Sequence, residues 1–209
     1  MENLNSNGLQ ARFWNSWNRS VREEGGLSEV QIDQAEVVDA WLSAIGRSDL
    51  DILEVGCGTG WLCPRLARFG TVTATDLSDV VLERAQERYP DIRFIAGDFM
   101  QLDLGRQNYD AVIALEVLSH VGDQPAFVTK LAGLLRSGGT LILATQNRFV
   151  LKNFNRIPPP APGQIRHWVD RHELRRLLDT EFRVEELYSL TPRANHGVMR
   201  LLKSRQFNL

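Results

Sequence analysis

The chain has 209 residues, of which 43% are hydrophobic and 24% charged, and its formal net charge at pH 7 is −2. This length favours one well-filled domain over two full-sized domains, and the composition is typical of a folded globular protein. A charge so close to zero gives no field that would attract nucleic acid or an anionic membrane to the whole molecule. We therefore expect a single domain over residues 1–209, a monomer or homodimer, with no nucleic-acid or membrane partner.

Two further features of the composition bear on location and metals. No apolar segment is as long as a membrane span, and the N-terminus lacks the basic and apolar regions of a signal peptide, so we expect a cytoplasmic protein. Cys57 and Cys63 have no His or Cys nearby at zinc-ligand spacing. They are predicted to be reduced thiols with packing roles, and no metal is expected.

Two helices are predicted before the first strand. Residues 10–24 place Trp14 and Trp17 at helical spacing among polar residues, and a second helix is predicted over residues 28–45. Together they form an expected helical cap over residues 1–48.

From residue 51 onward, short apolar runs alternate with helical segments, which is typical of βαβ units. Ser78 and Asp123 are predicted to cap two of the helices, and Gly138 with Gly139 is predicted to end the helix that Asp123 begins. The pattern indicates an α/β fold with a Rossmann-like, mostly parallel sheet flanked by helices, whose core is residues 49–145. The predicted strands are residues 51–55, 71–75, 92–96, 109–115 and 140–145.

Residues 146–169 form an insert after the fifth predicted strand. It contains four prolines and no clear periodicity, and long loops in compact domains often cover a site. Residues 170–209 would complete the fold: Asp170 and Glu173 have the spacing of a capping box, residues 182–190 are predicted to form a sixth strand, and residues 196–209 have a helical pattern.

A glycine-rich turn follows the first strand, in the sequence "ILEVGCGTG" at residues 52–60. Alternating glycines allow a sharp turn close to a ligand, and a helix predicted to begin near Trp61 would offer free N–H groups. The motif is weak alone, and Trp61 stands where a dinucleotide fingerprint requires its third glycine.

Acidic residues lie at the ends of successive strands. Asp76 is suited to two ribose hydroxyls, and Asp98 with Phe99 to an adenine amino group and ring. Glu54, inside the first strand, needs a buried partner such as a ligand ammonium reached through water, or neighbouring N–H groups. Each acid alone can simply end a strand or cap a helix. Together they lie where open α/β sheets bind ligands.

These motifs resemble those of the class I S-adenosylmethionine-dependent methyltransferases. "LEVGCGTG" is similar to the family's first motif, "TATDLS" to its second, "GDF" to its adenine contact, and "YDAVIALEVLSHV" to its fourth-strand motif. "LLRSGGTLILAT" is similar to the helix and strand that follow, so the resemblance covers residues 50–147. Within the class, "ALEVLSHV" followed by "ATQNR" looks most like small-molecule methyltransferases related to the ubiquinone-biosynthesis O-methyltransferases.

The resemblance implies S-adenosylmethionine as cofactor, S-adenosylhomocysteine as product, and a hydroxyl or amine of a small molecule as methyl acceptor. The family's antiparallel seventh strand is not matched by the helical pattern at residues 196–209. The cofactor-binding residues that the resemblance implies are Glu54, Gly56, Cys57, Gly58, Gly60, Asp76, Leu77, Asp98, Phe99, Leu115 and Glu116.

His120, four residues after Glu116, is the candidate for the base that removes a proton from the acceptor, because histidine titrates near neutral pH. It can equally orient a loop or bond a backbone carbonyl. Trp168 can instead anchor the insert to the sheet, and Trp14 and Trp17 can simply dock the first helix. The candidates for the acceptor pocket are Trp14, Trp17, His120, Arg166, His167 and Trp168.

Two other functions remain open at this point: a protein that binds S-adenosylmethionine without turnover, and a nicotinamide-dependent oxidoreductase, which Trp61 disfavours. The sequence "NRIPPP" at residues 155–160 is similar to the N-P-P-Y motif of amino methyltransferases, but it follows the fifth strand instead of the fourth. A nucleic-acid base is therefore not expected as the acceptor.

Overall fold

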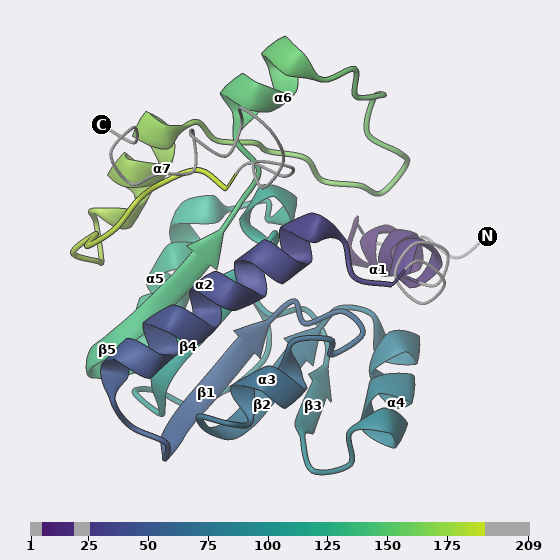
Figure 1. The fold of residues 1–209 in the computed structure, drawn as a ribbon. Helices are drawn as coiled ribbons and strands as arrows, with labels where there is room; N and C mark the ends of the chain where they lie inside the picture. The colour runs from purple at the N-terminus through teal and green to yellow at the C-terminus, as the bar shows by residue number, and fades with distance from the viewer. Residues whose placement is uncertain (1–5, 19–25, 191–209) are drawn as a thin grey trace.

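One parallel sheet forms the centre of the molecule (Figure 1). The computed structural model describes residues 6–18 and 26–190. Within them, five strands pair in the order β3-β2-β1-β4-β5, and every neighbouring pair is parallel. The α/β fold class predicted from the sequence is confirmed. The strands are β1 (Leu50–Val55), β2 (Gly70–Asp76), β3 (Arg93–Ala96), β4 (Tyr109–Leu115) and β5 (Leu135–Ala144).

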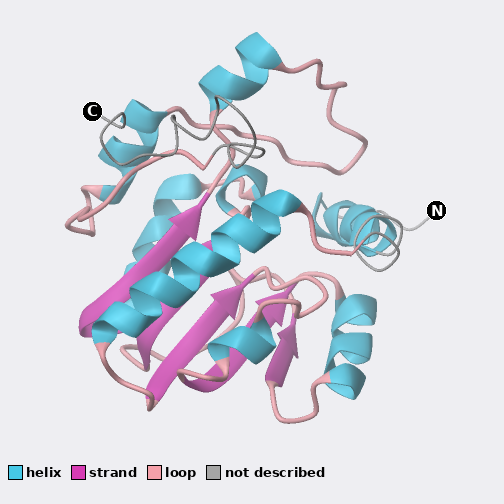
Figure 2. Ribbon diagram, viewed as in Figure 1, coloured by secondary structure: helices cyan, strands magenta, loops and turns pink. Residues whose placement is uncertain are grey.

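Helices cover both faces of this sheet (Figure 2). Ile52 and Ile113 pack in one core cluster with α2, α3 and α4, and Leu53 and Val112 pack in another with α5 and α7. Because both faces are buried, β1 and β4 are almost continuous apolar runs. The helices are α1 (Ser6–Trp17), α2 (Glu29–Ile45), α3 (Cys63–Leu66), α4 (Asp79–Arg88), α5 (Gln124–Leu134), α6 (Arg148–Phe154) and α7 (Arg171–Leu178), with a short 3₁₀ helix η2 (Leu118–His120).

The strand order reverses between β1 and β4: β2 and β3 lie on one side of β1, and β4 and β5 lie on the other. These two strands are hydrogen-bonded neighbours, although β2 and β3 come between them in the sequence. The loops that follow β1 and β4 therefore diverge to opposite sides and leave a crevice at the carboxyl edge, where open α/β sheets bind ligands.

The two N-terminal helices lie over the sheet and over this edge. Ser28 caps α2 in a reciprocal capping box with Gln31, and Gly46, at φ +73°, ends the helix, so the prediction for residues 28–45 is confirmed. α2 lies along one face of the sheet, while α1 lies beside the carboxyl ends of the strands (Figure 1). The C-terminal half of the first predicted helix, residues 19–25, lies outside the described residues.

The helix after the glycine turn begins later than predicted. It starts at Cys63 instead of near Trp61, and it is only four residues long. Residues 57–62 form turns, and Pro64 stands in the first turn of the helix, where its missing N–H costs nothing. α3 is therefore too short to supply the strong helix N-terminus that the motif suggests.

The boundary between α5 and β5 was also predicted wrongly. α5 begins at its Asp123 cap, as expected, but it ends at Leu134, and Leu135 already pairs with Tyr109 of β4. The glycines expected to end the helix, Gly138 and Gly139, lie inside β5, where the register shifts. The glycines thus form an irregularity in a strand and do not end the helix.

The C-terminal part differs from its prediction in two places. The insert contains the short helix α6. Residues 182–190 are not a strand: within the described part of the chain their backbone pairs with no other strand. Phe182, Val184 and Leu187 are instead partly buried against one core cluster, and the exposed Tyr188 packs edge-on against Trp41 at 5.9 Å between ring centroids. Residues 196–209, with their helical pattern, lie outside the described residues.

Candidate functional site

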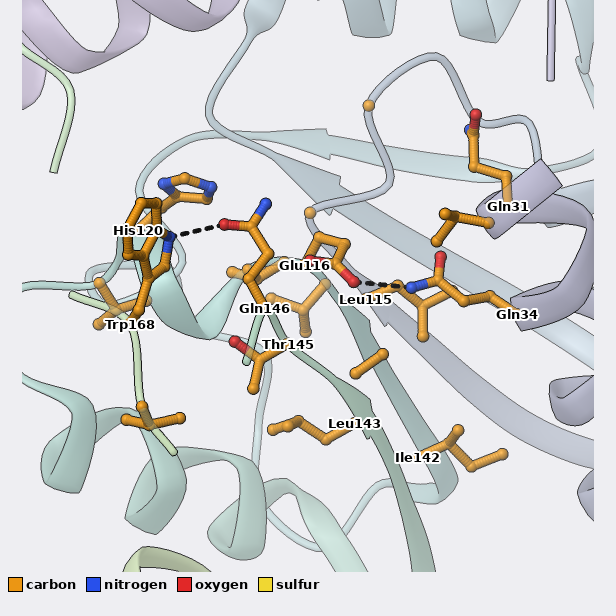
Figure 3. A pocket seen from close by; sticks show the side chains of 18 of the residues that line it. Gln31, Gln34, Leu115, Glu116, His120, Ile142, Leu143, Thr145, Gln146 and Trp168 are labelled. Atoms are coloured by element: carbon orange, nitrogen blue, oxygen red, sulfur yellow. Dashed lines mark hydrogen bonds between the residues drawn. The ribbon is translucent and has the colours of Figure 1, made fainter. Parts of the chain in front are cut away.

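A cavity of about 1030 Å³ lies at the carboxyl edge of the sheet. Its walls come from the ends of the strands, from α1 and α2, and from the insert. In Figure 3, Gln34 lies on one side of the cavity, His120 and Trp168 lie on the other, and Glu116 lies between them. Segments far apart in the sequence therefore share one pocket.

The glycine turn contributes two of its three glycines to the cavity wall. Gly56 has φ +71°, and a Cβ atom there would lie 2.3 Å from Cγ2 of Val117. Gly58 has φ +55°, and its N–H donates a hydrogen bond to the carboxylate of Asp76. Gly60 does not line the cavity: it is buried, and an added Cβ atom would meet the ring of Phe94 at 3.0 Å. A glycine is needed at position 60 because the backbone there packs against Phe94 of β3.

Asp76 is held rigidly at the end of β2. Its Oδ2 accepts a hydrogen bond from the N–H of Gly58, and its Oδ1 accepts one from the N–H of Ser78, both at 2.8 Å. Burial raises the pKa of Asp76, and these two bonds oppose the shift. Each carboxylate oxygen keeps a second lone pair for a ligand hydroxyl. Leu77, the next residue, lines the cavity beside it.

Glu54, near the end of β1, is a buried acid, and only 3% of it is exposed. The Cys63 thiol donates a hydrogen bond to its Oε2 at 3.1 Å. Burial raises the pKa of Glu54 to about 8, and the Cys63 bond lowers it. Glu54 is therefore mainly protonated at pH 7. Cys57 lines the cavity, and both cysteines are buried free thiols, as predicted.

Asp98 and Phe99 line the cavity after β3. The N–H of Met100 donates to Oδ1 of Asp98 at 2.9 Å, which fixes the carboxylate at the start of the loop. Phe99 packs edge-on against Phe127 at 5.2 Å, and the ammonium of Lys130 lies 5.0 Å from its ring centroid. The aromatic ring is thus fixed in orientation beside the acid.

Leu115 and Glu116 end β4, and the backbone at Glu116 is strained. Its φ of +62° is uncommon for a residue with a side chain. The side chain reaches α2, where the Gln34 amide donates to its Oε1 at 2.7 Å (Figure 3). Gln34 and Gln31 line the cavity although both are almost fully buried. The sequence reasoning missed them, and the signal was two glutamines on the apolar stripe of α2.

His120 stands on η2 and also lines the cavity. Its Nδ1 lies 2.9 Å from the carbonyl oxygen of Ile165, which belongs to the insert. A carbonyl can only accept, so Nδ1 carries the proton and Nε2 keeps a lone pair. Burial lowers the pKa of His120, which keeps the ring neutral. The indole of Trp14 packs edge-on against this ring at 4.6 Å.

The insert brings two of its three candidates to the cavity. Trp168 donates from Nε1 to Oε1 of Gln146 at 2.7 Å (Figure 3), and the Arg166 guanidinium lies 5.3 Å from the Trp168 ring centroid. Both line the cavity, whereas His167 is exposed and does not. From α1, both Trp14 and Trp17 line it, and Trp14 also packs edge-on against Trp17 and His120.

The described residues contain neither a cluster of metal ligands nor a helix that could span a membrane. In residues 6–18 and 26–190, no group of three or more His, Cys, Asp or Glu side chains is arranged to hold a metal ion. None of the helices described is both long enough and apolar enough to cross a membrane.

Residues 53–143 match a family model described as a methyltransferase domain. That range contains the glycine turn, Asp76, Asp98 and the end of β4, so the match includes the strand ends that line the cavity. Together with the relatives that follow, this match supports a class I S-adenosylmethionine-dependent methyltransferase.

Curated proteins support this family. An uncharacterised methyltransferase of Mycobacterium tuberculosis is 41% identical over 97 residues, which is 45% of this chain and 49% of that protein. A probable S-adenosylmethionine-dependent methyltransferase of Mycolicibacterium smegmatis is 31% identical over 138 residues, 65% of this chain and 53% of that protein. The ubiquinone biosynthesis O-methyltransferase of Rhodopseudomonas palustris is 34% identical over 107 residues, 48% of this chain and 42% of that protein. The methyltransferase chain thus spans about half the length of the curated relatives it matches.

Among solved structures, the PH0226 protein of Pyrococcus horikoshii has a TM-score of 0.67 at 17% identity, over 82% of this chain and 91% of that one. At this identity the likeness shows the fold alone. The α/β fold inferred from the sequence is therefore supported independently of the motifs.

Proposed function

We propose that this chain transfers a methyl group from S-adenosylmethionine to a hydroxyl or amine of a small molecule. The observation that carries the proposal is the single cavity that holds the acids Glu54, Asp76 and Asp98 at one end and His120 and Trp168 at the other. Ligand pockets measure about 300–1,000 Å³, so a cavity of about 1030 Å³ stands at the large end of that range.

The residues present fit the cofactor. Asp76 offers two oriented oxygens to the ribose, and Asp98 with Phe99 offers an acceptor and a ring face to the adenine. The turn at Gly56 and Gly58 brings backbone close to the methionine end. The proposed cofactor set is Glu54, Gly56, Cys57, Gly58, Asp76, Leu77, Asp98, Phe99, Leu115 and Glu116, without Gly60.

The residues at the acceptor end would align the reactants and remove a proton. The cofactor supplies a methyl group on a sulfonium, and in-line displacement depends chiefly on alignment. Leu115 and Glu116 form the wall between the two ends, and Trp14 and Trp168 exclude water from the acceptor. Nε2 of His120 accepts the proton that the acceptor hydroxyl or amine loses.

Arg166 limits the chemical class of the proposed methyl acceptor further. Its guanidinium donates to the carbonyl oxygen of Pro158 and to the side chain of Gln164, both at 2.6 Å, so it is held in place beside the Trp168 ring. A fixed cation next to an aromatic face is suited to a planar acceptor with an acidic or oxygen-rich substituent.

The test is methyl transfer from labelled S-adenosylmethionine to a panel of phenols, aromatic acids and amines. We expect label in at least one acceptor, with S-adenosylhomocysteine formed in equal amount. His120→Gln should lower kcat by about 10²-fold or more and leave the affinity for S-adenosylhomocysteine unchanged. Tight cofactor binding without transfer to any acceptor would instead indicate a binding protein without turnover.

A further inference from the structure

The η2 turn that carries His120 is held against the insert by one side chain, Gln124. The amide nitrogen Nε2 of Gln124 donates to the carbonyl oxygen of Leu118 at 2.9 Å and to that of His167 at 2.8 Å. Both hydrogens of this amide are used, one toward the turn and one toward the insert. A backbone bond from the N–H of His167 to the carbonyl of Ser119, at 2.7 Å, runs between the same two segments.

This contact lies next to the bond that sets the proton position on His120. Ile165, whose carbonyl oxygen meets Nδ1 of His120 at 2.9 Å, is two residues before His167 on the same extended segment. Any movement of that segment away from η2 would carry the carbonyl of Ile165 with it. The imidazole would then lose the acceptor that keeps its proton on Nδ1.

We propose that Gln124 is a positioning residue that fixes the tautomer of His120 by holding the insert against η2. The proposal rests on the proposed function, in which the Nε2 lone pair of His120 acts as the base. Gln124 does not line the cavity, so it acts through the segment that contains Ile165 and not on the substrate. The insert therefore shapes the acceptor pocket and also prepares the base.

Replacing Gln124 should leave its own helix intact. Gln124 is the first residue of α5, but the cap of that helix is Asp123, whose Oδ1 accepts from the N–H of Ala126 at 2.9 Å. Both hydrogen bonds of the Gln124 amide go to residues outside α5, Leu118 and His167. A change in His120 can therefore be separated from a change in the fold.

Nitrogen-15 NMR of the imidazole rings of the full chain, with S-adenosylhomocysteine present, tests the proposal without an acceptor. The chain has four histidines, and a His120→Gln sample assigns the signals of His120. In the natural protein we expect Nδ1 protonated and Nε2 unprotonated. Gln124→Ala should give a mixture of the two tautomers, and Gln124→Glu, which sets a carboxylate against two carbonyl oxygens, should give a larger shift.

Gln86→Ala is the matched control. Gln86 also uses one amide nitrogen to bridge two carbonyls, those of Pro90 and Ile92, at 3.2 and 3.1 Å, but it lies on α4 and does not line the cavity. This variant should leave the His120 signals unchanged. With an acceptor in hand, Gln124→Ala should lower kcat by about tenfold with little change in KM for S-adenosylmethionine.

The NMR result decides the proposal. A single Nδ1-protonated tautomer in Gln124→Ala and Gln124→Glu, with both variants folded, would overturn it. The proposed function is judged separately, by the turnover of His120→Gln. Full turnover there, combined with a tautomer shift in Gln124→Ala, would support Gln124 as the residue that fixes the ring and remove His120 as the base.

Discussion

Asp76 is the single residue whose proposed role in cofactor binding is the most sharply testable. Its two oxygens are aligned by the N–H groups of Gly58 and Ser78, so Asp76→Asn would set an amide N–H₂ against one of these donors. We expect a loss of about 1.5–3 kcal/mol in the binding of S-adenosylhomocysteine, roughly 10- to 150-fold in Kd, measured by titration calorimetry. Asp91→Asn, at an exposed acid, is the control. Equal affinity in Asp76→Asn would remove the ribose role.

Glu54 gives a prediction about stability and pH. Burial raises its pKa from 4.5 to about 8, so the folded protein keeps a proton that the unfolded chain loses above pH 4.5. The contribution of Glu54 to the free energy of unfolding is therefore full below about pH 4.5 and is lost as pH rises toward 8. Glu54→Gln keeps an acceptor for Cys63 and cannot ionise. Urea unfolding between pH 5 and 8.5 should show a smaller decline for this variant, whereas parallel curves would contradict the assignment.

At the scale of elements, the insert and α1 meet at a glycine. Gly163 has φ +84°, and a Cβ atom there would lie 2.7 Å from the carbonyl oxygen of Leu9. Gly163→Ala should therefore push α1 from the insert and strain the turn. We expect faster hydrogen exchange in α1 and weaker edge-on packing of Trp14 on His120, seen as a change in tryptophan fluorescence.

The control for that variant is Gly133→Ala. Gly133 lies in α5, and an added Cβ atom would meet nothing within 4 Å. Because alanine is favoured over glycine in a helix by about 0.8–1 kcal/mol, this variant should be slightly more stable, with unchanged exchange in α1. If Gly163→Ala exchanged as slowly as Gly133→Ala, the contact between α1 and the insert would not hold α1 in place.

The elements also show which parts of the fold the sequence could predict. The capping box at Asp170 and Glu173 formed as expected, because both halves of the motif lie within one turn of helix. Gly138 misled the prediction because a glycine with positive φ serves equally at a helix end and in a strand bulge, and pairing with β4 decides between them. For residues 182–190, the spacing of the apolar side chains was visible in the sequence, whereas the lack of a hydrogen-bonding partner strand among the described residues was not.

At the scale of the whole molecule, the site depends on which strands become neighbours. The pattern of acids after successive strands was sufficient to predict that Glu54, Asp76 and Asp98 line one cavity, because parallel strands end at one edge. The acceptor end was predictable only as a set of candidates. Gln34 reaches Glu116 across 82 positions of the chain and Ile165 reaches His120 across 45, and such contacts leave no local signature. Likewise, no local signature showed that His167 would be exposed while its neighbours Arg166 and Trp168 line the cavity.

The most direct test of this account is a crystal structure of the chain with S-adenosylhomocysteine. The account predicts the ribose hydroxyls on Asp76, the adenine beside Asp98 and Phe99, and the sulfur at Leu115 and Glu116, facing the side of the cavity that holds His120. A nucleoside bound outside this cavity, or inside it with the ribose away from Asp76, would contradict it.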